Sequence, residues 1–413
     1  MRRPLRVCMV HYSDYHLDSR IQRQARALAD RGDEVHLVCL SEPGTQQVGL
    51  GSIHLHRVPC EKPVGGAGAY VRGYGRFLAH AMRHVTALAL RGGLDLVEAD
   101  NMPDMLTAAA LVPRLRGTPV ILDVHDTFPE LFATKFGYPQ THRLVRVLEL
   151  EERLSAALAD HVITVTEEAR ERLESRGVGV GRSSVVMNSP DERVFGAARP
   201  PVDVPADGAV RVLYHGGLAP RFGVETAIRA VALLGEDLPR VELRVCGSGE
   251  DRDALAALAA ELEPGRVDVA PRPVPFEDIP RELEAAHIGV VPTLHDEFTE
   301  LLLPVKLLEY VHMGLPTVSS RLPGIRRYFD DESVRFFEPG SPQSLADALR
   351  DVCRDPAGAR ERALAATRRL APIGWEQQKA QYLELIDTLA ARNPTKARRK
   401  SGATRTVTST AAP

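Results

Sequence analysis

The first half of the chain alternates short apolar runs with segments whose apolar residues recur at helical spacing. Leu5 to His11 and Glu34 to Leu40 are runs of strand length, and Ile21 to Asp30 between them has a helical pattern. Strands that alternate with helices in this way predict a parallel sheet with helices packed on its faces. The expected fold class is therefore α/β.

The same alternation continues as far as residue 197. The pattern predicts helices within Gly65 to Gly93, near Met105 to Leu115, at Arg143 to Ala159 and from Glu167, and strands at Leu94 to Ala99, Pro119 to Val124 and Asp160 to Thr166. Residues 198–208 are rich in proline and small residues, which is typical of an interdomain linker. We expect residues 1–197 to form an N-terminal domain.

The second half repeats the scheme of strand, glycine turn and helix, and a last amphipathic helix begins near Trp375. With 413 residues, the chain exceeds the size at which a single core stops growing, which is about 250 to 300 residues. We predict a second domain at 209–371, a terminal helix at 372–392 and a disordered tail at 393–413.

Composition excludes several classes of protein. The 52 basic and 55 acidic side chains give a net charge of −3, so no global field attracts nucleic acid. The apolar run near the start is too short for a signal peptide, and no run is long enough to span a bilayer. We expect a cytoplasmic protein without a nucleic-acid partner.

The cysteines are five in number and widely spaced, at Cys8, Cys39, Cys60, Cys246 and Cys353. An odd, scattered set suits neither a disulfide framework nor a metal site. We predict reduced, buried thiols.

Candidate chemistry gathers between Leu294 and Ser320, where an acidic loop precedes a helix opened by Pro304 and closed by Gly314. Lys306 and Glu309 are three residues apart and share a face of this helix. The amides of its first turn, together with Lys306, would bind a phosphate, and Glu309 could accept hydrogen bonds from sugar hydroxyls. Taken alone, the same residues also fit a surface helix with one solvated ion pair.

The motif P-x-K-L-L-E-Y-x-x-x-G-x-P-T-V in this stretch resembles the donor-site segment of retaining, nucleotide-sugar-dependent glycosyltransferases of family four. The resemblance extends to about Ala391. It implies the GT-B fold, with two Rossmann-like β/α/β domains facing each other across a cleft and the terminal helix crossing back to the first domain. Many members carry two glutamates separated by seven residues. Glu309 matches the second, whereas Leu301 occupies the position of the first, so that role passes to the neighbouring Glu300.

The resemblance implies that a UDP- or GDP-linked sugar binds mainly to the second domain. Arg221, Lys306 and the helix amides would hold its diphosphate at a glycine turn containing Gly217, where the family usually has arginine. Two cations can stabilise a departing nucleoside diphosphate without a metal. We therefore expect no cofactor, and the sequence shows no strong metal cluster.

The nucleoside would contact three further positions according to the same resemblance. Glu309 would hold the ribose, and Arg272 begins the 272–278 segment at which relatives hold the base. Gly247 follows another strand and could border the nucleotide, although a tight turn explains this glycine equally well.

In the first domain the resemblance points to His125, which follows the strand ending at Val124. Ligands of open α/β sheets bind beyond the carboxyl ends of strands, and the family has a histidine here that faces the donor sugar. Asp126 could orient its ring. Asp18 and Arg20 occupy the acceptor side, although Asp18 also fits a helix cap and Arg20 a plain surface charge.

Basic and aromatic residues mix between Gly65 and Gly93, with Tyr70 and Phe77 beside Arg72 and Arg76. Such a helix can make peripheral contact with an anionic membrane, here at its inner face, although the solvated face of a domain helix explains the pattern as well.

Three functions fit these observations. The first is a metal-independent, retaining transfer of a sugar to a polysaccharide, glycolipid or natural-product acceptor. The second is sugar-nucleotide epimerisation on the same fold, which needs no acceptor. The third is a non-catalytic GT-B homologue that binds or acts as a scaffold, as the missing first glutamate and the incomplete basic pair would allow.

Overall fold

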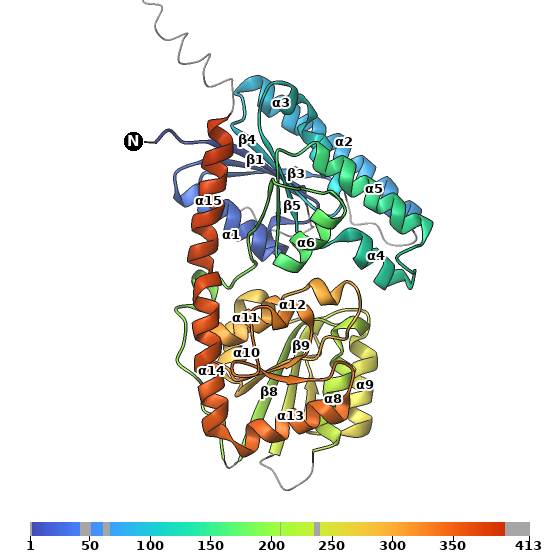
Figure 1. Ribbon diagram of the computed structural model, residues 1–413, viewed down its shortest axis with the longest axis vertical. Coiled ribbons are helices and arrows are strands. Elements are labelled where there is room, and N and C mark those ends of the chain that lie inside the picture. The colour runs from blue at the N-terminus through green and yellow to red at the C-terminus, as the bar shows by residue number, and fades with distance from the viewer. Residues whose placement is uncertain (1, 42–50, 61–66, 207, 235–239, 393–413) are drawn as a thin grey trace, which may run out of the picture. The chain divides into compact units, whose positions relative to one another are not determined.

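The structure is a computed structural model that describes residues 2–41, 51–60, 67–206, 208–234 and 240–392 (Figure 1). It divides into two compact units. Unit 1 contains Met1–Val186 and Lys379–Pro413, and unit 2 contains Met187–Gln378. Each unit is built on its own parallel sheet, so the α/β fold with two Rossmann-like domains is confirmed. The tail predicted at 393–413 lies outside the described residues.

Unit 1 has a seven-stranded sheet in the order β3-β2-β1-β4-β5-β6-β7, and all of its neighbouring strands pair in parallel. The strands are β1 Arg6–His11, β2 Glu34–Leu40, β3 Ile53–Val58, β4 Leu96–Asp100, β5 Val120–Val124, β6 His161–Thr164 and β7 Ser183–Val185. Helices cross between them as the apolar periodicity predicts.

Those helices cover both faces of the sheet. They are α1 Ser19–Asp30, α2 Ala67–Arg91, α3 Leu111–Leu115, α4 Phe128–Phe136, α5 Arg143–Ala157 and α6 Glu167–Ser175. One core joins the sheet to α2 and α5, and a second joins it to α1 and to the C-terminal part of α15 (Trp375–Ala391). Tyr382 of α15 is fully buried and donates a hydrogen bond from its hydroxyl to Oε2 of Glu98 at 2.6 Å. The residues of α15 from Lys379 onward therefore belong to unit 1.

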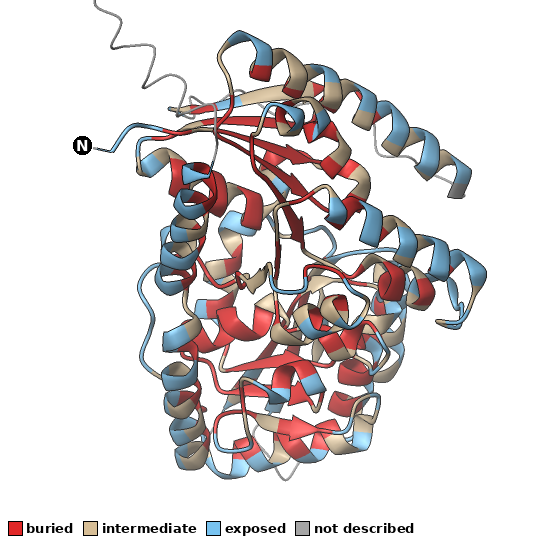
Figure 2. Cartoon of the chain, turned by 45° about the horizontal axis from the view of Figure 1, so that its top comes forward, coloured by how far each residue is buried: buried red, intermediate tan, exposed pale blue. Residues whose placement is uncertain are grey.

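Unit 2 has a six-stranded parallel sheet in the order β10-β9-β8-β11-β12-β13. The strands are β8 Ala209–Gly217, β9 Arg240–Ser248, β10 Val267–Val269, β11 Ile288–Val291, β12 Thr317–Ser320 and β13 Arg335–Phe337. The helices are α7 Glu192–Phe195, α8 Val224–Ala232, α9 Arg252–Leu262, α10 Ile279–Glu284, α11 Val305–His312, α12 Pro323–Arg326, α13 Pro342–Arg354 and α14 Pro356–Leu370. In both units the central strands are buried, whereas β3, β7 and β10 are only partly buried (Figure 2). Most helices have an exposed side, but α11 is buried from Lys306 to His312.

The boundary between the units differs from the linker predicted at 198–208. Unit 2 begins at Met187, so residues 198–208 lie within it. Backbone hydrogen bonds join this proline-rich segment to the end of α11. Arg199 N donates to His312 O at 2.9 Å, and Val202 N donates to Gly314 O at 2.8 Å. This segment therefore packs against the C-terminal end of α11, and the composition that suggested a linker accompanies this close packing.

In unit 1 the sequence pattern predicted most of the strands and helices and missed two strands. β3 carries histidines on alternate positions, and β7 is a short, polar strand at the sheet edge, so neither has an apolar run. The helix expected near Met105 to Leu115 is a 3-10 helix over Asp104–Ala110 followed by α3. All five cysteines are free and buried, as predicted. Among the described residues, no helix is long and apolar enough to cross a membrane.

Candidate functional site

The candidate donor site lies where the strand order of the unit 2 sheet reverses, between β8 and β11. Ligands of open parallel sheets bind beyond the strand ends at such a switch point. The loop after β8 leads to Arg221, and the loop after β11 leads to α11. Leu294 N donates to Arg221 O at 2.8 Å, so the two loops are bonded to each other.

Lys306, in the first turn of α11, is 9% exposed, and its side chain packs beside the end of β8. Its ammonium nitrogen Nζ donates to the hydroxyl of Tyr214 at 3.0 Å, and that hydroxyl donates to Gly217 O at 2.5 Å. Nζ also lies 4.2 Å from the centroid of the Tyr214 ring and 5.0 Å from that of Phe222. Burial lowers the pKa of Lys306 to about 7, although the charge of Glu309 opposes this shift. The alternative of a surface helix with a solvated ion pair is therefore excluded, because Lys306 and Glu309 are both buried.

Arg221 is the second cation of the donor site. Its guanidinium carbon Cζ lies 5.2 Å from the centroid of the Phe222 ring and 5.9 Å from that of Phe298. Its Nε is buried and has no hydrogen-bond partner among the described residues. Both cations thus lie about 5 Å from the same phenyl ring, and within the described chain neither forms an ion pair with a carboxylate.

Two helix starts face the ends of these strands without a capping side chain. α8 begins after Gly223 and α11 begins after Pro304, and neither residue makes a side-chain cap. The first amides of such helices, with the positive end of the helix dipole, attract anions. The backbone of Gly223 has φ +65°, and a Cβ there would lie 1.9 Å from Pro292 O. Only glycine therefore permits this approach of the two loops.

Glu309 lies one turn further along α11 and is 4% exposed. Its Oε2 is 3.1 Å from Nε2 of His215, the residue next to Tyr214 on β8. The His215 ring meets the Tyr310 ring edge-on, with centroids 5.2 Å apart. Sequence reasoning did not single out Tyr214 or His215, although both stand at the end of a strand that enters a glycine turn.

The predicted glycines are explained by close packing. A Cβ on Gly217 would lie 2.6 Å from the Phe222 ring, and one on Gly247 would lie 2.2 Å from Gly216 O. Gly247 therefore allows β9 to lie against the end of β8, which accounts for this glycine as a tight-packing position. Whether the nucleotide also passes there stays a prediction.

The acidic loop before α11 is ordered by its own side chains. Oδ1 of Asp296 accepts from the amides of Phe298 and Thr299, both at 2.8 Å, and Thr299 Oγ1 accepts from Asp296 N at 2.8 Å. Glu300 follows this turn, half-buried, with Oε2 3.7 Å from Nε2 of His295. Arg272 is exposed. The roles assigned to Glu300 and Arg272 stay predictions.

In unit 1, His125 lies near the switch point between β1 and β4. Its Nε2 is 3.4 Å from Oδ2 of Asp123 and 3.8 Å from Oδ1 of Asp100, and its side chain is 16% exposed. The sequence suggested Asp126 as the carboxylate that orients this ring, whereas the ion-pair distances identify Asp123 and Asp100. His11, Asp100 and Asp123 are register partners on neighbouring strands.

Burial and mutual repulsion set the protonation of these acids. Burial, followed by the charges of Glu98, Asp123 and Asp18, raises the pKa of Asp100 well above its usual value. Burial also acts on Asp123, but Arg20 and His125 outweigh it and hold the pKa of Asp123 below its usual range. Both Asp100 oxygens are buried and lack a hydrogen-bond partner among the described residues.

Asp18 and Arg20 belong to this cluster. Asp18 caps α1 by accepting from the amides of Arg20 and Ile21, so the predicted cap is correct. Its other oxygen is 3.4 Å from His11 Nε2. Burial would raise the pKa of Asp18, but His11, His125 and the two amides together lower it.

Arg20 is 3% exposed, which excludes the surface charge that the sequence also allowed. Its Nε and one terminal nitrogen donate to the two oxygens of Asp123, at 2.9 and 2.8 Å, and the other terminal nitrogen donates to Val186 O at 2.6 Å. Arg20 therefore acts on the site through Asp123.

Two features of this site were missed from the sequence. The side chain of Asn101 accepts from His125 N at 2.8 Å and donates to Asp126 O at 2.6 Å, which holds the loop after β5. Asp100, Asp123 and His125 also place three potential metal-ligand atoms within 4.8 Å of one another. However, Asp123 is already bonded to Arg20 and Gln24, which leaves it poorly suited to a metal. A charged residue inside an apolar strand, as in VILDVH, is the signal that could have revealed Asp123.

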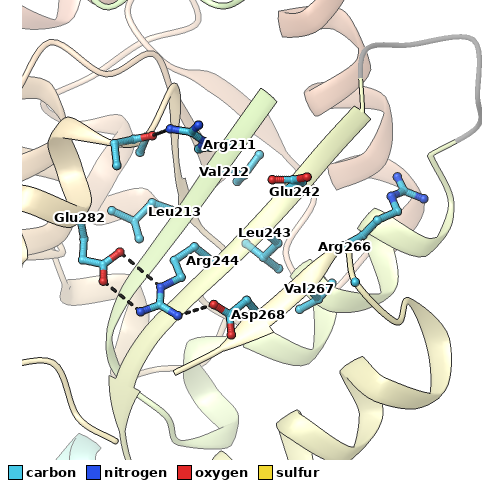
Figure 3. Close-up of a pocket in the computed structure, with 13 residues that line it drawn as sticks. Arg211, Val212, Leu213, Glu242, Leu243, Arg244, Arg266, Val267, Asp268 and Glu282 are labelled. Carbon is cyan, nitrogen blue, oxygen red and sulfur yellow. Dashed lines mark hydrogen bonds and ion pairs between the residues drawn. The ribbon is translucent and has the colours of Figure 1, made fainter. Parts of the chain in front are cut away.

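A pocket of about 410 Å³ lies elsewhere in unit 2, on the face of the sheet formed by β8, β9 and β10 (Figure 3). The charged side chains that line it already have partners. Arg244 bonds Glu282 at 3.3 and 3.0 Å and also pairs with Asp268, and Arg211 donates to Ala285 O at 3.2 Å. Because these side chains are already paired and no candidate donor residue lines the pocket, it is not assigned to the nucleotide.

Helix α2 turns most of its aromatic and apolar side chains into the core. Phe77 is fully buried, and Tyr74, Leu78 and Met82 pack against the same cluster. Peripheral membrane contact would therefore depend on Arg72, Arg76, Arg83 and Arg91 with the exposed Val71 and Leu90.

The chain is similar in fold to sucrose-phosphate synthase from Thermosynechococcus elongatus, with a TM-score of 0.74 at 18% identity, over 94% of this chain and 99% of that one. The Anabaena protein HepE, solved with UDP and glucose, has a TM-score of 0.68 at 15% identity, over 93% and 100%. The two Rossmann-like units thus define a GT-B fold.

The family follows from two family models that together cover most of the chain. A glycosyl transferase 4-like domain matches residues 17–189, and glycosyl transferases group 1 matches residues 209–355. The chain belongs to the group 1 glycosyltransferases.

Curated relatives agree with this membership. Glycogen synthase from Mycobacterium tuberculosis is 28% identical over 216 residues, which are 51% of this chain and 50% of that protein, so the chain spans about half the length of this relative. The 2-deoxystreptamine glucosyltransferase of Streptomyces kanamyceticus is 24% identical over 355 residues, covering 82% of this chain and 89% of that protein.

Proposed function

We propose that the chain transfers a sugar from a nucleoside-diphosphate sugar to a hydroxylated acceptor, with retention of anomeric configuration and without a metal. The single observation that carries this proposal is the pair of cations without carboxylate partners, Arg221 and Lys306, at two uncapped helix starts. A diphosphate is an anion of the size and charge that such a site favours.

In this proposal, unit 2 holds the donor. Arg221, Lys306 and the first amides of α11 bind the diphosphate and stabilise the charge that grows on it as the glycosidic bond breaks. Glu309, oriented by His215, accepts hydrogen bonds from the ribose. The Anabaena structure contains UDP, which supports uracil as the first base to test.

Unit 1 supplies groups for the sugar and the acceptor. His125 hydrogen-bonds a hydroxyl at the strand ends, while Asp123 and Asn101 hold its ring and its backbone. Asp18 remains partly exposed and ionised, so it can accept a hydrogen bond from an acceptor hydroxyl. Glu300 is assigned to the sugar from the family motif alone.

The test is product analysis with and without acceptor. The chain is incubated with UDP- and GDP-sugars and with acceptors from the polysaccharide, glycolipid and aminocyclitol classes, in the presence of EDTA. We expect nucleoside diphosphate and a glycosylated product whose anomeric coupling matches that of the donor. A changed sugar nucleotide in the absence of acceptor would establish an epimerase instead, and donor binding without any product would establish a binding protein.

A further inference from the structure

Helix α5 carries an uncovered stripe of apolar side chains on the outside of unit 1 (Figure 1). Leu144, Val147, Leu150 and Leu154 recur at spacings of three and four residues, so they lie along one side of the helix. Their exposed fractions are 48%, 60%, 53% and 61%. A surface helix normally turns such a stripe toward the core. Single exposed leucines are ordinary, whereas a contiguous apolar patch marks a contact surface.

A groove of about 330 Å³ lies beside this stripe and enlarges the apolar surface. Its apolar lining consists of Met105 and Ala108 of the 3-10 helix, and of Val147, Leu150, Leu154 and Leu158 of α5. Two polar residues of the lining, Glu151 and Ser155, are hydrogen-bonded to each other at 2.9 Å. The groove therefore offers a predominantly apolar surface, which suits an acyl chain.

The exposed charges of α5 are all positive. Every exposed charged residue of this helix is an arginine, at Arg143, Arg146 and Arg153. Within the described chain, none of the three forms an ion pair with a carboxylate. The acids of the helix, Glu149, Glu151 and Glu152, are partly or fully buried. The apolar stripe is thus bordered by basic groups whose negative partners must come from outside the described chain.

The same combination of residues continues at the end of α4, which precedes α5. Phe136 and Tyr138 are 50% and 37% exposed, and Lys135 is exposed beside them. The Tyr138 ring stacks on that of His142, the N-cap of α5, with centroids 4.3 Å apart. Aromatic rings next to basic groups suit the boundary between water and lipid, because the ring is apolar and the charge stays hydrated.

We propose that α5 and the end of α4 dock unit 1 on an anionic membrane surface. The leucine stripe enters the boundary between headgroups and acyl chains, and the arginines bind lipid phosphates. The stems of the arginine side chains cover apolar surface while their guanidinium groups reach the headgroups. This contact does not depend on the proposed sugar transfer.

The charges of α5 distinguish a membrane from a second copy of the chain. The three arginines are spread along the helix, so two copies packed face to face would bring like charges together, which disfavours that contact. Helix α2, whose sequence also suggested a membrane, is less suited. Among the described residues, its exposed large apolar side chains are Val71 and Leu90, which stand far apart on the helix.

Vesicle flotation of the full chain tests the proposal. One set of vesicles contains phosphatidylglycerol and phosphatidylcholine, and the other contains phosphatidylcholine alone. We expect strong binding to the anionic vesicles at low salt, weaker binding at high salt and weak binding to the neutral vesicles. Arg146→Gln with Arg153→Gln should weaken binding to the anionic vesicles roughly fivefold for each arginine. Leu150→Gln with Leu154→Gln should weaken it by at least about tenfold.

The matched control replaces two exposed leucines of unit 2. Leu233→Gln with Leu364→Gln makes the same chemical change at side chains that are 46% and 40% exposed, and this variant should bind as the wild type does. All the replaced side chains are exposed, so each variant should fold, and melting curves verify this.

A fluorescent label locates the contact. All five native cysteines are buried, so an environment-sensitive dye would react selectively with the cysteine of a Val147→Cys variant. Its emission should shift to the blue on adding anionic vesicles, whereas a dye attached through Leu364→Cys should show no shift.

Three results would overturn the proposal. The first is no binding of the wild type to anionic vesicles at low salt. The second is unchanged binding by the variant with Leu150→Gln and Leu154→Gln. The third is a dimer in solution that this variant dissociates, without any dye shift on vesicles, which would assign the stripe to a second copy of the chain.

Discussion

Lys306 is a buried lysine whose surroundings suit the binding of an anion. Its ammonium group has one hydrogen-bond acceptor among the described residues, the Tyr214 hydroxyl, and aromatic rings on other sides. Burial without a carboxylate partner destabilises the charged form, which is why its pKa falls to about 7. A diphosphate beside it would supply the missing negative charge. The same residue is therefore costly in the free protein and favourable in the complex.

From the lowered pKa of Lys306 we predict that donor binding depends on pH. Above pH 7 the free protein holds Lys306 largely neutral, whereas the bound diphosphate favours the ammonium form, so binding takes up a proton. Affinity for the nucleotide sugar should fall as pH rises above about 7, by up to about tenfold per pH unit. Calorimetry at pH 6, 7 and 8, in two buffers of different ionisation enthalpy, measures the uptake directly. Lys306→Met should abolish it, and an equal uptake in that variant would assign the proton to another group.

From the raised pKa of Glu98 we predict that the stability of the fold depends on pH. Burial and the charge of Asp123 raise its pKa to about 8, far above the value of an unfolded glutamate near 4.3. Between these two pKa values the folded chain holds a proton that the unfolded chain releases. The contribution of Glu98 to the free energy of unfolding is therefore most favourable below about pH 4.3 and declines as pH rises toward 8. Glu98→Gln keeps a group that can accept from Tyr382 and should flatten this decline. Melting temperatures from pH 5 to 8.5 test it, and equal slopes for the two proteins would contradict it.

At the scale of elements, the pattern of apolar and polar residues was sufficient for the strands and helices that bury a continuous apolar side. β2 was predicted at its observed bounds, and the helix ends at Pro304 and Gly314 were marked by residue type. The pattern failed at β3, because histidines interrupt its apolar run. It also failed at residues 198–208, because the proline-rich segment packs against the end of α11 and does not link the two units. Periodicity shows which face of a helix or strand is buried, but it does not show which other element packs against that face.

A substitution at Gly223 should destabilise the turn between β8 and α8. Gly223→Ala would place a Cβ against Pro292 O at a left-handed residue, so it should destabilise the chain by about 1–3 kcal/mol or more and separate the β8 loop from the β11 loop. Gly75→Ala, within α2 and with open space around its Cβ position, is the control and should stabilise by roughly 0.5–1 kcal/mol. Chemical denaturation of both variants gives the comparison. Equal stability of the two would contradict the required approach of the loops.

At the scale of the whole molecule, the sequence predicted two parallel-sheet domains, and the structure has them. Arg221, Lys306 and Glu309 converge around the end of β8, as the motif implied. The partners of Lys306 and Glu309 could not be predicted, because Tyr214, His215 and Phe222 come from a segment of the chain that is distant in sequence; Lys306 and Tyr214 are 92 residues apart. In unit 1 the same limit applied to Asp123, whose bond to Arg20 spans 103 residues. Contacts between strand ends are set by sheet order, which local pattern does not contain.

We propose that Arg221 and Lys306 hold a nucleoside diphosphate, and titration of variants with a nucleotide sugar tests this most directly. Lys306→Met and Arg221→Gln are compared with Arg229→Gln, an exposed arginine of α8 that pairs with Glu225. Each of the first two removes hydrogen bonds to a charged group, about 1.5–3 kcal/mol, so the nucleotide sugar should bind them roughly ten- to a hundredfold more weakly than the wild type. The control should bind unchanged. Wild-type affinity in both Lys306→Met and Arg221→Gln would contradict the assigned donor site.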